Sequence, residues 1–410
     1  MENLPPNAFQ PLELDTLDAE NTVGQLLCQA AEMSASDMFI LSNERSVNVA
    51  VRRMGVLEPM AELPVERGRQ LISFVKVMAG MDISEHRRPM DGRWLCDTQG
   101  RKLDIRINTI ATLFGEDMTL RIWDRDQELL ELDDLGLSSR DIATVQGMLS
   151  HPSGLILVTG PTGTGKTTTQ YACIHQLNDG TRKINTLEDP IEYAMPGVRQ
   201  SQVHHKLGIE FPDLLQNVLR QSPDVIMIGE IRDEFTATTA VRAANSGHLV
   251  LATLHAPIAA GAVQSMLALG AQPYFFSGCL LGVIAQRLVR MLCDDCKVEY
   301  DISEARGTFD DVTTLLEPGE GNAIYGPAGC EKCFQAGYIG RTGIFEVMTM
   351  THEIRHFVAE ARTAEEIHAL ATKTGMVEFR RGALLKVAQG ITSTEEILRA
   401  VPSEHLGLED

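Results

Sequence analysis

The stretch GLILVTGPTGTGKTT, residues 154–168, constrains the fold of this chain more than any other feature. An apolar run ends in a glycine-rich loop, and the loop leads directly into a helical pattern. Gly160 to Thr168 matches GxxxxGK[ST] in the strand, loop and helix context that gives this motif its meaning. The glycines allow backbone N–H groups to face phosphates, and the helix N-terminus adds the positive end of its dipole. The stretch therefore predicts a nucleoside triphosphate site.

Within this loop, each residue type has an expected task. Lys166 supplies a positive charge to the β- and γ-phosphates, and the Thr167 hydroxyl is a ligand for Mg²⁺. The predicted nucleotide-binding residues are Gly160, Pro161, Thr162, Gly163, Thr164, Gly165, Lys166, Thr167 and Thr168.

Three further apolar runs follow the first, and helical stretches separate them. The four runs are GLILVTG, KINTLED, DVIMIGE and HLVLATLH. Such alternation predicts an α/β fold with a parallel sheet that helices cover on both faces. Ligands of open α/β sheets bind beyond the carboxyl ends of the strands, so the polar residues that end these runs should converge on one site.

Acidic residues end two of these strands. Glu230 ends DVIMIGE, where a carboxylate can hold Mg²⁺ through water or polarise the attacking water. Glu188, Asp189 and Glu192 surround a turn in LEDPIEY, and one of them could orient water for attack on the γ-phosphate. An acidic loop that only caps a helix is the alternative interpretation of LEDPIEY.

Two histidines flank the last of the four runs. His255 follows its carboxyl end and could contact a γ-phosphate, whereas His248 precedes it. Lone histidines are often structural, so spacing alone leaves both roles open and favours His255 over His248.

Two CxxC pairs, Cys293 with Cys296 and Cys330 with Cys333, are separated by 33 residues. Such pairs can form disulfides, redox couples or a metal site, and a reducing compartment disfavours disulfides. Together they predict a Cys₄ Zn²⁺ site whose closed ligand shell makes it structural. The other cysteines, predicted to be ordinary buried thiols, are Cys28, Cys96, Cys173 and Cys279.

Length and charge narrow the functional classes. With 410 residues the chain is long enough for two or three domains, and its net charge of −20 and 5% aromatic content disfavour a nucleic-acid groove. The N-terminus lacks the pattern of a signal peptide, and no run of about 18 uncharged apolar residues occurs. We therefore expect a cytoplasmic protein without a transmembrane segment.

The pattern along the chain predicts five parts. Before the phosphate loop, SVNVAVRRMGVL alternates like one strand, and LDIRINTIATL with DMTLRIWD resembles a strand pair. The predicted parts are a flexible lead-in (1–17), an α+β N-terminal domain (18–133), an ATPase domain (134–292), a tetracysteine subdomain (293–348) and a helical C-terminal region (349–410).

Five motifs in this order resemble the secretion ATPases of type II secretion and type IV pilus assembly, the GspE and PilB group. The motifs are TGPTGTGKTTT, TLEDPIEY, LRQSPDVIMIGEIRD, SGHLVLATLH and AQRLVRMLCDDC. The resemblance implies a RecA-like ATPase domain, a PAS-like N-terminal domain and a zinc subdomain. It further implies a homohexamer that binds ATP, Mg²⁺ and Zn²⁺ and moves an inner-membrane platform protein.

The same resemblance assigns roles to single residues. It implies that Glu192 is the general base, Glu230 the Walker B carboxylate and His255 the residue of the His box. Arg106 and Arg121 lie in segments that resemble the paired arginine segments of the family, which implies contact with the γ-phosphate. Attachment to the inner membrane would then depend on partners, the platform protein and possibly a membrane recruiting protein.

Departures from the family pattern identify a divergent member with a short N-terminus. The departures in the ATPase region are Gln216, Ser222, Phe235, Ala256 and Ser265, and those in the N-terminal region are Phe39 and Met54. The alternatives are a RecA-like nucleic-acid translocase and a nucleotide-binding adaptor without turnover. The tetracysteine region favours assembly or secretion over retraction.

Overall fold

The computed structural model describes residues 18–98, 100–124, 129–302 and 307–407. The predicted lead-in, residues 1–17, lies outside the described residues. The chain divides into two compact units, residues 1–128 with 329–337 and residues 129–328 with 338–410. Within the described ranges, no helix is both long enough and apolar enough to cross a membrane.

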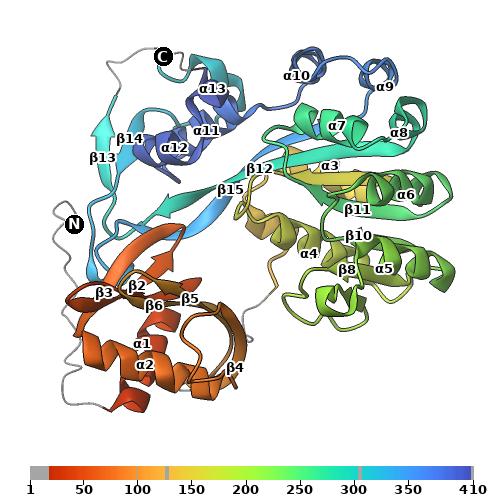
Figure 1. Cartoon of the computed structure of the whole chain (residues 1–410). Helices are drawn as coiled ribbons and strands as arrows, with labels where there is room; N and C mark the ends of the chain where they lie inside the picture. The colour runs from red at the N-terminus through yellow and green to blue at the C-terminus, as the bar shows by residue number, and fades with distance from the viewer. Residues whose placement is uncertain (1–17, 99, 125–128, 303–306, 408–410) are drawn as a thin grey trace. The chain divides into compact units, whose positions relative to one another are not determined.

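Unit 1 is a six-stranded antiparallel sheet with two helices packed on one face (Figure 1). The strand order is β3-β2-β1-β6-β5-β4. The elements are α1 (Ala19–Glu32), β1 (Asp37–Ser42), β2 (Ser46–Arg53), β3 (Val56–Pro64), α2 (Val65–Met78), β4 (Met90–Thr98), β5 (Arg101–Thr112) and β6 (Gly115–Asp124). The expected α+β architecture and the strand pair β5 and β6 are present.

The segment SVNVAVRRMGVL does not form one strand, as its alternation predicted. Strand β2 ends at Arg53, and Met54 and Gly55 have φ angles of 50° and 81° before β3 begins at Val56. Positive φ at two successive residues is typical of the tight turns that join antiparallel strands. Apolar and polar residues alternate in both β2 and β3, so the alternation continues across the turn. The sequence pattern therefore did not reveal where β2 ends.

Unit 2 is built on a seven-stranded sheet in the order β15-β12-β7-β11-β10-β8-β9. All neighbouring strands are parallel except β15, which pairs antiparallel with β12. The strands are β7 (Gly154–Thr159), β8 (Ile184–Glu188), β9 (Arg199–Gln202), β10 (Val225–Ile228), β11 (Leu249–Leu254), β12 (Leu280–Leu292) and β15 (Tyr338–Thr349). The four predicted apolar runs are β7, β8, β10 and β11, which confirms the predicted parallel sheet.

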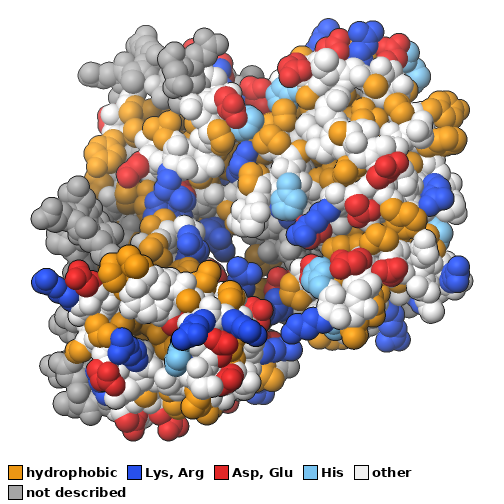
Figure 2. All heavy atoms as spheres, viewed as in Figure 1, with side chains coloured by type: hydrophobic (Ala, Val, Ile, Leu, Met, Phe, Trp, Pro, Cys, Tyr) orange, Lys and Arg blue, Asp and Glu red, His pale blue; other side chains and the backbone are white. Residues whose placement is uncertain are grey.

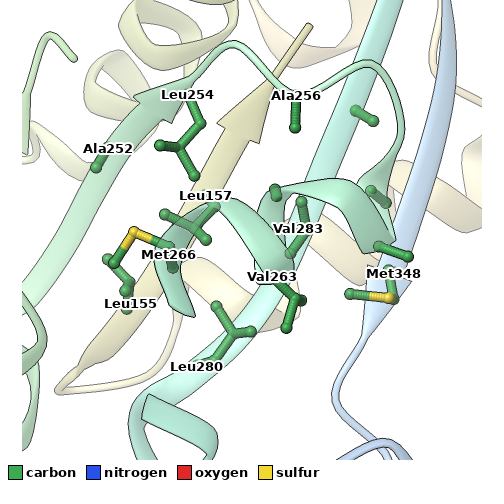
Figure 3. Close-up of a cluster of buried hydrophobic side chains, with 14 of the residues drawn as sticks. Leu155, Leu157, Ala252, Leu254, Ala256, Val263, Met266, Leu280, Val283 and Met348 are labelled. Atoms are coloured by element: carbon green, nitrogen blue, oxygen red, sulfur yellow. The ribbon is translucent and has the colours of Figure 1, made fainter. Parts of the chain in front are cut away.

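Side chains of the central strand β7 alternate between two cores. Leu155 and Leu157 belong to one buried cluster, whereas Ile156 and Val158 belong to the cluster on the opposite face. Figure 3 shows the first cluster, where Leu155 and Leu157 lie among side chains of β11, β12 and α7. Helices therefore cover both faces of the sheet, and the strand ends are left as its polar edge.

The helices of unit 2 include those that alternate with the parallel strands and a C-terminal group. They are α3 (Ser139–Leu149), α4 (Lys166–Leu177), α5 (Phe211–Val218), α6 (Glu234–Asn245), α7 (Ala259–Ala268), α8 (Pro273–Cys279), α9 (His352–Ala359), α10 (Ala364–Lys373), α11 (Phe379–Ala388), α12 (Thr394–Ala400) and α13 (Ser403–Leu406). A small antiparallel pair, β13 (Val298–Asp301) and β14 (Ala323–Gly326), completes the unit.

One buried carboxylate fixes the start of two of these helices. Glu346 on β15 accepts hydrogen bonds from the N–H groups of Ala259, at 3.0 Å, and Phe379, at 3.2 Å. Those residues begin α7 and α11, whose cap residues make no side-chain hydrogen bond of their own. Burial raises the pKa of Glu346, and the two backbone N–H groups oppose that shift. Its contact fixes α7, which follows the end of β11 closely.

Candidate active site

The loop between β7 and α4 forms the centre of the candidate site. Gly160, Gly163 and Gly165 have φ angles of 147°, 79° and 86°, a backbone that favours glycine. Lys166 begins α4, and its ammonium donates to the carbonyl oxygens of Gly160 at 2.8 Å and Pro161 at 2.9 Å. The lysine thus lies folded over its own loop.

Burial lowers the pKa of Lys166, and the negative charge of Glu230 opposes that shift. A buried ammonium whose hydrogen bonds go to carbonyl oxygens gains free energy when a phosphate anion binds beside it. The neighbouring Thr167 is exposed at the start of the helix, so its hydroxyl is available to a metal ion that accompanies the phosphates. The loop therefore has the donors that a Mg²⁺ nucleotide requires.

Two neighbouring strands bring Glu230 and His255 together. Glu230 follows β10, His255 follows β11, and these strands run parallel and adjacent. The Nε2 atom of His255 lies 3.3 Å from Glu230 Oε2, and Arg232 Nη2 lies 2.6 Å from Glu230 Oε1. The polar strand ends converge as the sequence predicted, and Arg232 is an addition that the sequence did not single out.

Glu188 is buried in a network of hydrogen bonds. Its carboxylate accepts from the hydroxyls of Tyr171 and Thr186, the latter at 2.5 Å, and from the amide of Gln200 at 3.0 Å. Burial, and after it the charge of Glu188, raises the pKa of Tyr171, so the phenol keeps its proton. With three donors bound, the Glu188 carboxylate is poorly placed to accept a proton from water.

The partly buried Glu192 joins this network through its backbone. Its backbone N–H donates to the Tyr171 hydroxyl at 3.4 Å. Tyr171 also packs edge-on against Tyr193, with ring centroids 4.5 Å apart. Tyr171 thus connects the phosphate-loop helix α4 to the segment that carries both acidic candidates.

The third acidic residue of this segment, Asp189, pairs with a histidine. His205 Nε2 lies 3.0 Å from Asp189 Oδ2, and His205 Nδ1 lies 2.9 Å from Glu210 Oε1. The hydrogen bond to Glu210, and after it the one to Asp189, raises the pKa of His205. This bridge holds the turn after β8 to the segment that begins α5.

His248 lies at the other end of β11 from His255. Its Nδ1 atom lies 3.0 Å from the carbonyl oxygen of Ala243, at the end of α6. The six residues of β11 separate the two histidines by roughly 20 Å. Only His255 therefore lies at the edge of the sheet where the phosphate loop is.

In unit 1, Arg106 and Arg121 lie directly opposite each other on β5 and β6, and Arg93 lies opposite Arg106 on β4. Asp37 lies 3.3 Å from Arg121, and Asp104 pairs with Arg93 at 2.5 to 2.9 Å. Like charges that face each other across strands destabilise a sheet unless anions neutralise them. Asp37 and Asp104 supply such anions to Arg121 and Arg93, so carboxylates of unit 1 itself stabilise this row of guanidinium groups.

The four cysteines of the two CxxC pairs form one cluster. The sulfur atoms of Cys293, Cys296, Cys330 and Cys333 all lie within 4.8 Å of one another. Four thiolates bound to one Zn²⁺ at about 2.3 Å have sulfurs roughly 3.8 Å apart, so the cluster fits the ion. Backbone N–H groups of Cys330 and Gly337 donate to the Cys333 sulfur at 3.1 and 3.2 Å, which stabilises a thiolate.

The segment that carries the second pair, residues 329–337, belongs to unit 1 and contacts Arg53 of that unit. The Arg53 Nη1 atom donates to the carbonyl oxygen of Cys333 at 3.2 Å, and the guanidinium lies 5.5 Å from the ring centroid of Phe334. Of the other cysteines, Cys173 and Cys279 are buried free thiols as predicted, and burial raises the pKa of Cys279 to about 11 and of Cys173 to about 12. The prediction is wrong for Cys28 and Cys96, which are free thiols but only partly buried.

Sequence reasoning missed the side chains that support the site. They are Tyr171, Gln200, His205, Arg232 and Gln286. Each contacts a residue distant in sequence, apart from Arg232, so a local pattern could not have identified it. Arg232 and Gln286 did have a signal, because they lie in the motifs LRQSPDVIMIGEIRD and AQRLVRMLCDDC.

The comparisons with known proteins agree with this geometry. The family described as Type II/IV secretion system protein matches residues 14–399. The type II secretion system protein E of Pseudomonas aeruginosa is 41% identical over 382 residues, which cover 93% of this chain and 75% of that protein. The type IV pilus assembly ATPase PilB of Thermus thermophilus is 38% identical over 394 residues, 95% of this chain and 43% of that protein.

Solved structures share the fold. The pilus retraction motor PilT with bound ADP has a TM-score of 0.62 at 25% identity, covering 93% of this chain and 97% of that one. The Yersinia pseudotuberculosis ATPase DotB has a TM-score of 0.72 at 19% identity and covers 99% of both chains. At that identity the second likeness supports the fold alone.

Proposed function

The chain belongs to the type II/IV secretion system protein family, and on this premise we propose that it is an ATPase that powers assembly of a pilus or pseudopilus. The observation that carries the proposal is the convergence of Lys166, Glu230 and His255 beside a phosphate loop. The system served is type II secretion or type IV pilus biogenesis.

Hydrolysis assigns a task to each group at this edge of the sheet. A water oxygen forms a bond to the γ-phosphorus of ATP while the bond from that phosphorus to the β–γ bridging oxygen breaks. Glu192 takes the proton of the water, because the Glu188 carboxylate is already bound by three donors. Lys166 neutralises phosphate charge, and the products are ADP and inorganic phosphate.

Thr167 and Glu230 are the residues that would hold Mg²⁺, which supplies positive charge to the phosphate oxygens when it is bound. The Glu230 carboxylate is oriented by Arg232, at 2.6 Å, and by His255, at 3.3 Å. His255 is thereby positioned to respond to the γ-phosphate. The four clustered cysteines would hold a structural Zn²⁺.

We further propose that the protein acts as a homohexamer and that Arg106 and Arg121 contact the γ-phosphate. Two guanidinium groups that face each other across β5 and β6 are suited to neutralise the charge that develops on the transferred phosphoryl group. Domain motions would then pass to an inner-membrane platform protein. The chain would be cytoplasmic and attached to the inner membrane through that partner, with a membrane recruiting protein as a second candidate. The predicted division into five parts stays a prediction.

The first experiment measures phosphate release from Mg²⁺-ATP by the purified full chain, alongside its native mass. Glu192→Gln should lower turnover by ~100-fold or more while ADP binding persists, because a general base acts on chemistry and not on binding. Glu395→Gln, an exposed carboxylate at the start of α12, is the matched control and should leave turnover unchanged.

Each other outcome has a defined meaning. Full turnover in Glu192→Gln would reject the assigned base, and binding without turnover in the wild-type assembly would support a nucleotide-binding adaptor. Turnover that rises when single-stranded DNA is added would support a translocase instead. On the face that Figure 2 shows, Lys and Arg side chains lie interspersed with Asp and Glu, so we expect no such rise.

A further inference from the structure

The side chain of Gln286, on β12, contacts both the phosphate loop and the helix that follows it. Its Nε2 atom donates to the carbonyl oxygen of Thr164 at 2.6 Å, and its Oε1 atom accepts from the hydroxyl of Thr169 at 2.8 Å. The side chain is buried, with 1% of its surface exposed. A buried amide that satisfies one partner with each end is fixed in both position and orientation.

The orientation of this amide follows from its partners. Thr164 presents a carbonyl oxygen, which only accepts, so the NH₂ group of Gln286 must face it. The Thr169 hydroxyl then donates to the remaining oxygen. Thr169 lies in the first turn of α4, so one side chain connects the loop to the helix that follows it.

This contact determines where a loop N–H group points. The Thr164 carbonyl and the Gly165 N–H belong to one trans peptide unit, in which C=O and N–H point in opposite directions. A hydrogen bond that holds the carbonyl toward β12 therefore directs the Gly165 N–H away from β12. Gly165 caps α4, whose first N–H groups have no partner within the helix and are the donors that bind phosphate.

Gln286 also limits the space available to a side chain at two glycines of the motif. A Cβ atom on Gly160 would lie 2.6 Å from the Gln286 carbonyl oxygen, and one on Gly165 would lie 3.2 Å from Gln286 Nε2. The first distance is a steric clash with backbone. The phosphate loop thus packs directly on Gln286. The main chain of Gln286 lies against Gly160, and its side chain lies beside Gly165.

We propose that Gln286 is a positioning residue that orients the Thr164–Gly165 peptide and thereby sets the affinity of the site for nucleotide phosphates. This inference rests on the proposed function only in taking the loop to bind nucleotide. Gln286 affects the phosphates only indirectly, through the backbone of the loop, and it does so equally in the ground state and in the transition state. Loss of its side chain should therefore weaken the binding of substrate and transition state by the same factor.

The test uses Gln286→Met and Gln286→Glu in the full-length protein. Met has a similar volume and makes neither hydrogen bond, and Glu keeps the acceptor for Thr169 but faces the Thr164 carbonyl with an oxygen. A fluorescent ADP analogue measures affinity, and steady-state kinetics separate KM from kcat. We expect both variants to raise the Kd of the analogue and the KM for ATP about 10-fold, with kcat within about 2-fold.

Gln146→Met, an exposed glutamine on α3, is the matched control and should bind as wild type does. If Gln286→Glu bound the analogue as tightly as wild type, the donated hydrogen bond to Thr164 would have no positioning role and the proposal would fall. A lowered melting temperature with unchanged KM would also overturn it, because that pattern belongs to a purely structural side chain. Wild-type protein that failed to bind the analogue would instead reject the proposed function.

Discussion

Among the described residues, each unit buries one lysine, and the two lysines are neutralised in different ways. In unit 1, Lys76 lies 2.5 to 2.6 Å from the carboxylate of Glu116 and donates to the carbonyl oxygen of Glu85 at 2.7 Å. In unit 2, Lys166 donates to two carbonyl oxygens of its own loop, and burial lowers its pKa. The first ammonium donates to a carboxylate, whereas the second donates to carbonyl oxygens and has the Glu230 carboxylate only as a neighbouring charge.

Under the proposed function, this difference separates a structural cation, Lys76, from a phosphate-binding one, Lys166. Lys76 and Glu116 form a buried ion pair, and the bond from Lys76 to the Glu85 carbonyl oxygen fixes the segment after α2. A buried pair that is broken leaves one charge without compensation. Under the proposed function, a phosphate that binds beside Lys166 supplies the full counter-charge that its carbonyl partners do not. Replacing Lys76 should therefore lower stability more than activity, and replacing Lys166 should lower activity more than stability.

The largest effect is expected for Lys166→Ala. Loss of the charge beside the phosphates should reduce turnover on the order of 10² to 10³-fold, as for removal of other groups that stabilise developing charge. The unfolding midpoint should change little, since a desolvated ammonium whose hydrogen bonds go to carbonyl oxygens adds little to stability. Phosphate release and thermal unfolding on the same sample check both arms, and turnover above a tenth of wild type would contradict the assignment.

Lys76→Met should show the reverse pattern. It leaves the Glu116 carboxylate buried without its partner and should destabilise unit 1 by about 3–5 kcal/mol. Both tryptophans of the chain, Trp94 and Trp123, lie in unit 1, so their fluorescence during denaturant unfolding reports on that unit. The double variant Lys76→Met/Glu116→Leu should recover most of the loss. An unchanged midpoint in the single variant would mean that the pair does not stabilise unit 1.

The cysteine cluster differs from both lysines, because a metal ion would neutralise the negative charge of its thiolates. The purified protein should hold about one Zn²⁺ per chain, and Cys330→Ser should retain clearly less, because the closed shell loses one thiolate. Cys96→Ser, which lies outside the cluster, is the control. Metal content by mass spectrometry and a count of reactive thiols check this. Equal zinc in Cys330→Ser and wild type would argue against a four-cysteine site.

The smallest effect concerns His205, an exposed cation between two carboxylates. Hydrogen bonds to Glu210 and Asp189 raise its pKa above the usual 6.5, so the bridge adds stability that is complete below pH 6.5. That stability is lost as the pH rises through the raised pKa. Solvent screening keeps the effect small. Titration of the His205 ring by NMR should give the raised pKa, and a value at or below 6.5 would exclude the bridge.

Much of the fold could be predicted because its signals are local. The phosphate loop, the four apolar runs of the sheet and the two CxxC pairs are contiguous patterns that report backbone geometry or ligand chemistry directly. The turn at Met54 and Gly55 was missed because alternation continued on both sides of it. The choice between Glu188 and Glu192 could not be made, because it depends on the burial of one carboxylate.

By itself the sequence determined the parallel sheet, the nucleotide loop and the metal-ligand chemistry, because each rests on residue types at fixed short spacings. Only the tertiary structure placed Gln286 against Thr164 and paired Lys76 with Glu116, at sequence separations of 122 and 40 residues. Packing of distant segments decides which polar side chains are buried and what neutralises them. That compensation distinguishes a lysine that holds the fold together from one that is ready to bind phosphate.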